Sequence, residues 1–160
     1  MTKVTTKELR SVFWRSFALQ GAFNYERMQN IGYCYSMIPV IKRLYSEKKE
    51  QSASLVRHLE IFNTTPAVVP TIMGIITAME EENANNVDFD EQSINAVKAS
   101  LMGPLAGIGD SIFWGTLRII AAGIGVSIAK DGIIFGPILF LLIYNIPNFL
   151  IRIFGLKLGY

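Results

Sequence analysis

Two ionisable side chains, Asp110 and Arg118, stand within a long apolar and glycine-rich stretch of this sequence. The residues around them, 100–129, have the composition of a membrane segment. A carboxylate among apolar residues is costly unless it is paired or faces a polar cavity. The pair therefore indicates a polar site inside a membrane protein.

The spacing of these residues predicts a shared face. On a regular helix Asp110, Trp114 and Arg118 occupy positions i, i+4 and i+8. Asp110 and Arg118 are then about 12 Å apart along the axis and do not pair with each other. Each needs a partner on another helix, on a ligand or on another subunit. Interhelical salt bridges that fix the packing are the alternative interpretation, and the sequence leaves both open.

A second candidate site lies in residues 20–30, where acids, amides and aromatic residues interleave in an otherwise apolar region. Carboxylates and amides bind adjacent sugar hydroxyls, and aromatic rings cover the C–H face of a sugar. On a helix Asn24 and Arg27 share one face, and Glu26 and Asn30 share another. The alternative is an amphipathic helix that lies at the membrane interface.

Two amides, Asn145 and Asn148, flank Pro147 in the most apolar segment of the chain. Proline frees a backbone carbonyl one turn earlier, and nearby amides can satisfy that carbonyl. The same amides can instead line a substrate path. Both interpretations stay open.

The remaining residues give little sign of metal or cofactor chemistry. His58 is the only histidine and lies in a polar stretch, so a surface or capping role is expected. Cys34, the only cysteine, is typical of a small buried apolar residue. No phosphate-binding loop or zinc signature occurs, and no cofactor is expected. The basic residues are scattered and the net charge is +2, which argues against a nucleic-acid partner.

The elements that position these residues are expected to be helical. Hydrophobic residues make up 51% of the chain and the mean hydropathy is +0.34, more apolar than most soluble domains. Residues 1–10 read as a polar N-terminal arm in which Thr5 or Thr6 caps a helix. Residues 11–160 are expected to form one membrane-embedded domain. The predicted fold class is an all-α, polytopic membrane protein with broken or re-entrant helical hairpins.

Three apolar segments are candidates for contact with the bilayer. In residues 11–45, Gly32 and Pro39 predict a bend, as in a re-entrant hairpin or an interfacial helix. Residues 61–79 would span about 28 Å as one helix. Their prolines favour a broken helix or hairpin, and a buried helix of a soluble core is the alternative. Residues 133–151 are the best transmembrane candidate.

Polar segments separate these stretches. The polar stretch at 46–60 and the residues before it carry Lys42, Arg43, Lys48, Lys49 and Arg57, which favours the cytoplasmic side. Residues 80–92 are acidic and are expected on the opposite side. Lys130-Asp131-Gly132 predicts a short polar turn. Two motifs with small residues four apart, Gly103 to Gly107 and Gly132 to Gly136, allow helices to approach closely.

Four longer motifs occur in order along nearly the whole chain. They are Asn24-Tyr-Glu-Arg-Met-Gln-Asn30, His58-Leu-Glu-Ile-Phe-Asn-Thr64 with Pro66, Leu101-Met-Gly-Pro-Leu-Ala-Gly-Ile-Gly-Asp-Ser-Ile-Phe-Trp-Gly-Thr116, and Asn145-Ile-Pro147. With these motifs the sequence resembles the IID subunit of mannose-family phosphotransferase-system permeases. The resemblance implies a multi-pass protein of the bacterial cytoplasmic (inner) membrane that translocates a hexose of the mannose class.

The resemblance also implies partners. A IID subunit pairs with a IIC membrane subunit, and the heterodimers assemble into a trimer. The phosphoryl group comes from a histidine of the cytoplasmic IIB protein, so this chain is expected to hold no phosphocarrier residue. The sugar pocket is shared with IIC, and the expected substrate-binding residues of this chain are Glu26, Asn24, Asn30, Asp110, Trp114, Arg118 and Asn145.

Some complexes of the family resemble docking receptors for bacteriocins. A non-transporting scaffold or docking subunit is therefore the alternative function. A membrane enzyme that applies Glu26, Asp110 and Arg118 directly to its substrate is a second alternative. Members of the family are considerably longer and have a further C-terminal membrane region, so we expect a fragment, a truncated product or one half of a split subunit.

Overall fold

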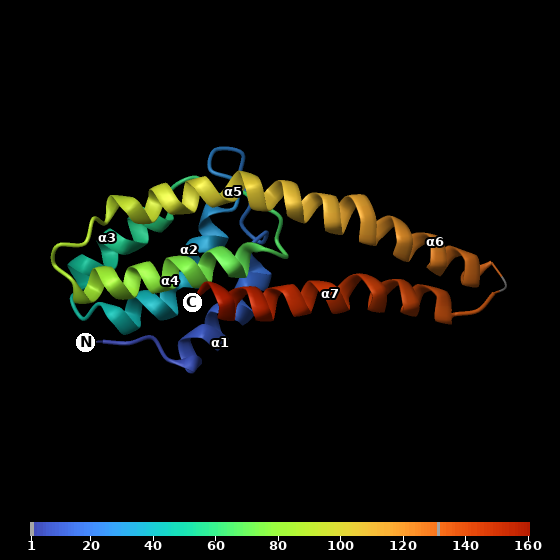
Figure 1. Ribbon diagram of the computed structural model, residues 1–160, viewed down its shortest axis with the longest axis horizontal. Helices are drawn as coiled ribbons and strands as arrows, with labels where there is room; N and C mark the ends of the chain where they lie inside the picture. The colour runs from blue at the N-terminus through green and yellow to red at the C-terminus, as the bar shows by residue number, and fades with distance from the viewer. Residues whose placement is uncertain (1, 131) are drawn as a thin grey trace.

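The computed structural model describes residues 2–130 and 132–160. The elements are α1 (Thr6–Arg15), η1 (Ser16–Ala18, a 3₁₀ turn), α2 (Asn30–Leu44), α3 (Lys48–His58), α4 (Val69–Asn85), α5 (Gln92–Ile112), η2 (Phe113–Leu117, a π-helical turn), α6 (Arg118–Ala129) and α7 (Phe135–Gly159). The described residues contain no strand, and the predicted all-α fold class is confirmed (Figure 1).

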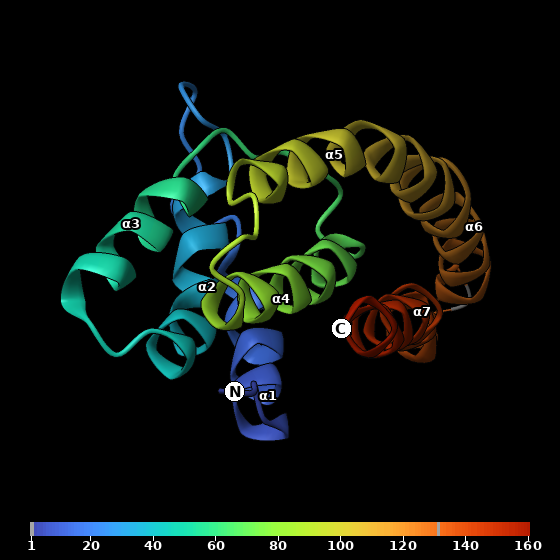
Figure 2. The ribbon, with the colours of Figure 1, turned by 60° about the vertical axis from the view of Figure 1, so that its left-hand side comes forward.

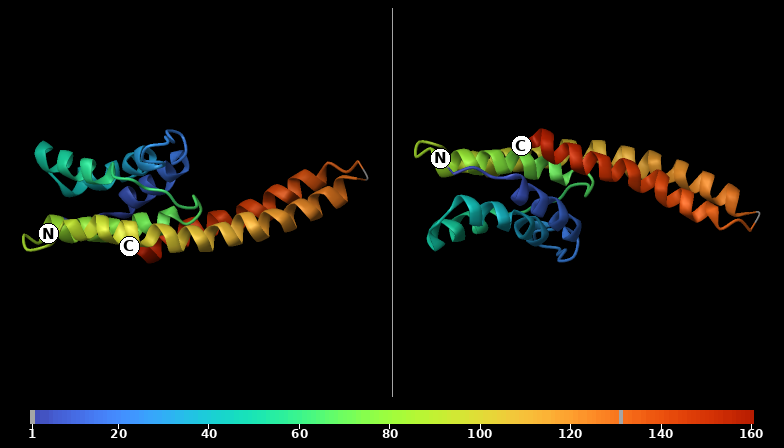
Figure 3. Two further views of the ribbon diagram at one scale, coloured as in Figure 1. Left: turned by 90° about the horizontal axis from the view of Figure 1, so that it is seen from above. Right: turned by 90° about the horizontal axis from the view of Figure 1, so that it is seen from below.

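The helices divide into a body and a long hairpin. Helices α1 to α4 and the first part of α5 form the body, and both chain ends lie there (Figure 1). Helix α5 continues through η2 into α6, and α7 returns beside α6, so that the two arms extend well beyond the body (Figure 3). In the turned view, α6 and α7 lie side by side and apart from α2 and α3 (Figure 2).

The apolar core lies between α2 and α4. Apolar residues recur three or four apart on each helix, which gives each helix one buried face. The fully buried members include Tyr33, Met37, Val40 and Ile41 of α2 and Val69, Ile72, Met73 and Ile76 of α4. Phe62 packs between them, with its ring centroid 4.3 Å from that of Tyr33.

The helix does not break at Gly32 or Pro39, because both residues lie inside α2. The chain instead reverses in the loop before α2. Gly32 allows the helix to touch that loop, since a Cβ atom there would overlap the backbone of Leu19. Pro39 is tolerated because Arg15 Nη1 donates to the carbonyl of Tyr35 at 3.1 Å, the carbonyl that a proline at position 39 leaves without its helical donor.

The single helix predicted over residues 61–79 is not present. The chain runs without regular helix after α3, and α4 begins only at Val69, with Pro70 in its first turn. A proline there loses no helical hydrogen bond, because the first amides of a helix have no partner within it. The prolines therefore set the start of α4, and the broken form of the prediction is the correct one.

Two helical stretches are long and apolar enough to cross a membrane, Gln92–Ala129 and Phe135–Gly159. Each has a window with a mean hydropathy of 1.7, and only 17% and 6% of those windows are buried within the chain. The second stretch contains residues 135–151 of the segment 133–151, which the sequence marked as the best transmembrane candidate. The predicted turn between the arms includes Lys130 and Gly132, whereas Asp131 lies outside the described residues.

Glycines set the closest helix contacts. A Cβ atom on Gly74 of α4 would lie 2.5 Å from the carbonyl oxygen of Leu156 in α7, so these two backbones touch. A Cβ atom on Gly136 would overlap the backbone of Gly125 across the hairpin, whereas one on Gly132, the other member of the small-residue motif at 132–136, would meet no described atom within 4 Å. A Cβ atom at Gly103, in contrast, would meet no described atom within 4 Å.

The basic and acidic polar segments lie at the same end of the body, which corrects the expectation of opposite sides. Arg57 Nη1 lies 2.6 Å from Glu91 Oε2. A cavity of about 520 Å³ is lined by residues of both segments, including Tyr45 and Asn83. The charge patterns of the two segments are complementary, so they attract each other across the end of the bundle.

Candidate functional site

The loop before α2 carries three of the predicted site residues. Its ends are joined by a pair of backbone hydrogen bonds, from Asn24 N to Met28 O at 3.0 Å and from Met28 N to Asn24 O at 2.9 Å. The Asn24 side chain closes the turn by accepting from the backbone amide of Arg27 at 2.7 Å. Met28 adopts a left-handed φ of 59°, which is uncommon for a residue with a Cβ atom.

Asn24 and Asn30, the first residue of α2, lie together, although helical spacing assigned them to different faces, because residues 20–29 form a loop and not a helix. Asn24 Nδ2 donates to Asn30 Oδ1 at 2.9 Å, and Asn30 Nδ2 donates to the carbonyl of Leu59 at 2.7 Å. Asn30 is buried and Asn24 is half-buried. Their amides hold the loop against the segment that follows α3.

Glu26 is not part of that contact. Its side chain is 83% exposed, and its nearest charged neighbour is Arg27, whose Nε atom lies 3.6 Å from Glu26 Oε1. The structure therefore places Glu26 on the outer surface of the loop, beside the exposed ring of Tyr25. A ligand or a second subunit can reach this carboxylate directly.

The extended segment between α3 and α4 links the loop to α5. Gln29 Nε2 donates to Thr64 O at 2.9 Å, and the amide of Thr64 donates back to Gln29 Oε1 at 3.1 Å. The hydroxyl of Thr64 then donates to the carbonyl of Met102 in α5 at 3.1 Å. Gln29 and Thr64 were not among the predicted site residues, although both lie in the motifs that carry the family resemblance.

Asp110 has its partner in the same segment. Thr65 Oγ1 donates to Asp110 Oδ1 at 2.6 Å. Gly109 makes this approach possible, because a Cβ atom there would lie 2.6 Å from the Cβ atom of Thr65. Among the described residues Asp110 forms no salt bridge. Asn24, Asn30 and Asp110 are thus joined through one polar strip, which we define as Asn24, Gln29, Asn30, Thr64, Thr65 and Asp110.

The regular face predicted for Asp110, Trp114 and Arg118 is interrupted by the π-helical turn. Thr116 Oγ1 donates to Ser111 O, five residues earlier, at 2.9 Å. Such turns widen a helix locally and shift the residues that follow them to another face. Arg118 stacks on Trp114, with Cζ 4.9 Å from the ring centroid, and both side chains are exposed on the hairpin.

Asn145 lies on α7 and is half-buried. Its Nδ2 atom donates to Leu141 O at 2.8 Å. The carbonyl that Pro147 deprives of its helical donor is that of Ile143, so the expected compensation by this amide does not occur there. Asn148 instead accepts from Arg152 Nε at 2.8 Å.

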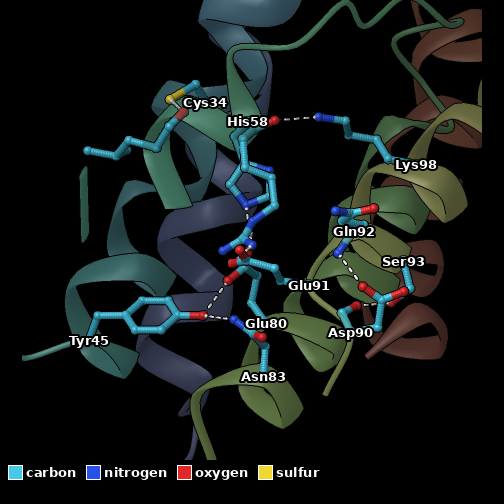
Figure 4. Close-up of polar contacts among 12 residues, drawn as sticks. Cys34, Tyr45, His58, Glu80, Asn83, Asp90, Glu91, Gln92, Ser93 and Lys98 are labelled. Carbon is cyan, nitrogen blue, oxygen red and sulfur yellow. Dashed lines mark hydrogen bonds and ion pairs between the residues drawn. The ribbon is translucent and has the colours of Figure 1, made fainter. Parts of the chain in front are cut away.

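A second polar cluster was missed by sequence reasoning. It surrounds Glu80, whose side chain is fully buried in the body (Figure 4). Tyr45 Oη donates to Glu80 Oε2 at 2.6 Å, and Arg57 Nε donates to Oε1 at 3.1 Å. His58 Nε2 lies 3.0 Å from Oε1. The surface role expected for His58 is wrong, because α3 turns this side chain onto α4 and buries it completely.

Burial and charge act against each other within this cluster. Burial lowers the pKa of His58 below its usual 6.5, although the Glu80 carboxylate opposes that shift. Burial alone raises the pKa of Glu80, but contact with His58, the Tyr45 hydroxyl and the Arg57 charge lower it below its usual 4.5. Glu80 is therefore ionised and His58 neutral at neutral pH.

The Glu80 cluster joins four helices. Arg57 reaches Glu91 at the start of α5, and Lys98 Nζ of α5 donates to the carbonyl of Arg57 at 3.1 Å. Tyr45 follows α2, and Glu80 belongs to α4. The partners lie 22 (His58 to Glu80) to 41 residues apart in the sequence, so no local spacing indicates them.

The chain matches a known protein family over nearly its whole length. The family described as "PTS system mannose/fructose/sorbose family IID component" matches residues 3–160. The mannose-specific EIID component of Escherichia coli (strain K12) is 46% identical over 159 residues, which are 99% of this chain and 56% of that relative. The Fructose permease IID component of Bacillus subtilis (strain 168) is 49% identical over 158 residues, 99% of this chain and 58% of the relative.

A solved structure resembles this chain at a comparable level of sequence identity. The mannose transporter ManYZ, determined by cryo-electron microscopy in complex with microcin E492, contains a chain with a TM-score of 0.96 and 45% identity. The match covers 100% of this chain and 59% of that chain. This chain therefore spans little more than half the length of the relatives that it matches. It is a membrane protein that belongs to the mannose/fructose/sorbose family of PTS IID components.

Proposed function

We propose that this chain acts in a phosphotransferase-system permease that translocates a hexose of the mannose class. The observation that carries the proposal is its 46% identity, along 99% of its length, to a mannose-specific EIID component. In this proposal it works in the bacterial cytoplasmic membrane with a IIC subunit, as part of a trimer of heterodimers. The cytoplasmic IIB protein phosphorylates the sugar.

The polar strip supplies suitable chemistry for sugar hydroxyls. Asp110 accepts one hydrogen bond from Thr65 through Oδ1, and a carboxylate has further acceptor sites on its second oxygen. Asn24 and Asn30 form the opposite end of the strip. We assign Asp110 the role of hydroxyl acceptor and the two asparagines the role of holding the loop that carries Glu26.

The site is completed by the second membrane subunit in this proposal. Trp114 and Arg118 lie exposed on the hairpin, and much of the surface around them is apolar. An aromatic face and a cation so placed can contact either the sugar or a facing helix of IIC. Asn145 of α7 adds an amide that can bind a sugar hydroxyl.

Substitutions in the intact IIC–IID complex test the site. Asp110→Asn removes the charge but keeps an oxygen that can accept from Thr65. Glu26→Gln likewise removes the charge of the loop carboxylate and keeps an acceptor oxygen. We expect each to reduce uptake of a radiolabelled hexose by about tenfold or more, mainly through KM, since a hydrogen bond to a charged group contributes roughly 1.5–3 kcal/mol.

The matched control is Asp88→Asn, which removes an exposed acid from the loop before α5. It should leave uptake unchanged. Complex assembly is followed by size-exclusion chromatography so that misfolding is not mistaken for lost binding. Normal uptake in both Asp110→Asn and Glu26→Gln would remove these residues from the sugar site.

A second function is favoured by one observation. The similar solved transporter is bound to microcin E492. In this chain the loop before α2 exposes Phe23 and Tyr25, whose ring centroids lie 6.1 Å apart. We propose that the complex also serves as a docking receptor for such a bacteriocin. Tyr25→Ser should protect cells from microcin E492 without reducing hexose uptake, and unchanged killing would exclude this loop.

A further inference from the structure

A groove of about 410 Å³ separates α1 from the C-terminal turns of α7. Its apolar lining includes Leu9 and Phe13 of α1 and Ile153 and Leu156 of α7. We call it the α1–α7 groove. The two helices lie close together near the chain end, where α7 leaves the hairpin and joins the body (Figure 1).

Two cations stand at the groove, one on each wall. Arg10 belongs to α1 and Lys157 to the last turn of α7, and both side chains are exposed. Neither forms a salt bridge among the described residues. Among the described residues, no Asp or Glu side chain lines the groove. Two like charges beside an apolar cavity are therefore complementary to an anion that carries an apolar tail.

The position of the groove matches a membrane interface. Lys157 ends a helix that is long and apolar enough to cross a bilayer. Further basic residues stand nearby on the body, where Arg43 Nε donates to the carbonyl of Lys3 at 3.1 Å. Clusters of Lys and Arg at the cytoplasmic end of a spanning helix attract anionic lipids, and basic pockets there bind their headgroups.

We propose that the α1–α7 groove binds an anionic phospholipid, with an acyl chain on Leu9, Phe13, Ile153 and Leu156 and the phosphate between Arg10 and Lys157. An apolar cavity with two cations among its lining residues favours a lipid over an uncharged hydrophobic segment. The bound lipid fixes the angle between α1 and α7, and thereby the position of the hairpin relative to the body.

The test uses the full-length subunit in its complex with IIC, purified and delipidated in a neutral detergent. Dioleoylphosphatidylglycerol is titrated, and the thermal unfolding midpoint and the bound lipids in native mass spectra are recorded. We expect phosphatidylglycerol to raise the midpoint. Phosphatidylcholine, which has no net charge, and glycerol phosphate, which has no acyl chain, should not.

Two kinds of variant locate the effect. Arg10→Gln combined with Lys157→Gln should raise the half-saturating lipid concentration by about tenfold or more, because each cation near an anionic lipid contributes on the order of 1 kcal/mol. The matched control, Lys48→Gln combined with Lys49→Gln, removes the same charge from exposed positions of α3 and should change nothing. Ile153→Trp fills the groove without changing charge and should displace one lipid.

Equal stabilisation of the wild type and the Arg10/Lys157 double variant would overturn the proposal. So would equal stabilisation by phosphatidylcholine, or a wild-type complex whose midpoint does not respond to phosphatidylglycerol because protein covers the groove. Hexose uptake is measured separately on the same variants. A permease that transports but shows no lipid effect refutes only the lipid site.

Discussion

Among single residues, Glu80 of α4 contacts side chains from two other parts of the body. Its buried carboxylate is shared by Tyr45, Arg57 and His58 from two other parts of the chain. Removing one partner from a buried charged cluster leaves the remaining charges unpaired in the interior. The resulting loss of folding stability is larger than the stability that an exposed ion pair contributes.

We predict that Glu80→Gln destabilises the protein by about 3 kcal/mol, because it leaves the Arg57 charge largely buried with one fewer acid. Unfolding in detergent, followed by circular dichroism, measures the change. The control is Glu82→Gln, an exposed acid two residues further along α4, which should alter stability little. Equal effects of the two variants would contradict the buried role of Glu80.

The same cluster predicts a pH dependence. The folded-state pKa of His58 lies below its usual 6.5, so below about that pH the unfolded chain binds more protons and stability falls. The folded-state pKa of Glu80 lies below 4.5, so its stabilisation is present above 4.5 and is lost as the pH falls through the folded value. Both groups therefore destabilise the protein on acidification.

The expected result is a thermal midpoint that falls steadily from neutral pH to about pH 4. The variant His58→Gln should remove the part of the decrease that begins near 6.5 and keep the part due to Glu80. A midpoint that rises on acidification, or a His58→Gln profile identical to that of the wild type, would show that these assignments of charge are wrong.

Single residues also show what the sequence can and cannot predict. The polar nature of Asp110, Asn24 and Asn30 was visible because each stands out against apolar neighbours. The contact of Asp110 with Thr65 was not, because it depends on how an irregular segment folds back onto α5. His58 was misplaced for a related reason, since a polar local sequence does not reveal that α4 supplies a buried acid for it.

Glycines allow the closest backbone contacts between elements. The contact between α4 and α7 is the joint between body and hairpin, and Gly74 lies at its centre. Alanine is intrinsically about 1 kcal/mol better than glycine inside a helix. A loss of stability when Gly74 is replaced by alanine must therefore come from the close contact between α4 and α7.

We predict that Gly74→Ala lowers the unfolding free energy by about 1–3 kcal/mol, because the new methyl group meets the backbone of α7, which cannot move aside like a side chain. The same change at Gly123 of α6 meets no described atom within 4 Å and should be neutral or slightly stabilising. Chemical unfolding of the two variants gives the comparison. A neutral Gly74→Ala would mean that α4 and α7 are not packed this closely.

Among the elements, the strongly apolar α7 was predictable from composition and length, and the proline-rich start of α4 was not. Proline restricts the backbone in ways that fit both a break and a first helical turn, and only packing decides between them. Pro39 is the opposite case, because Arg15 from α1 compensates for it and the helix continues.

Across the whole molecule, the hairpin is the feature that implies a membrane and a partner. Its second arm, α7, has 25 residues and extends about 37 Å, enough for a hydrocarbon core of about 30 Å. Its apolar side chains are largely exposed within this chain. The sequence predicted this apolar surface, but its local pattern does not decide which parts would face lipid and which would face the proposed IIC subunit.

We predict that the tip of the hairpin and the polar end of the body lie on opposite sides of the membrane. Single cysteines at Lys130 and at Lys48, introduced in a Cys34→Ser background, should react with a membrane-impermeant maleimide from opposite sides of sealed vesicles. Lys48 should be reached from the cytoplasmic side. Labelling of both positions from the same side would contradict a hairpin that crosses the bilayer.

The most direct test of the proposed function is sugar uptake coupled to phosphorylation, measured in bacterial cells that lack their own mannose permease. The full-length subunit that contains this chain is expressed with IIC and the soluble phosphocarriers, and intracellular sugar is separated into free and phosphorylated forms. The account predicts hexose phosphate only when IIC, IIB and this subunit are all present. Absence of uptake with the complete set, or full uptake when this subunit is omitted, would contradict it.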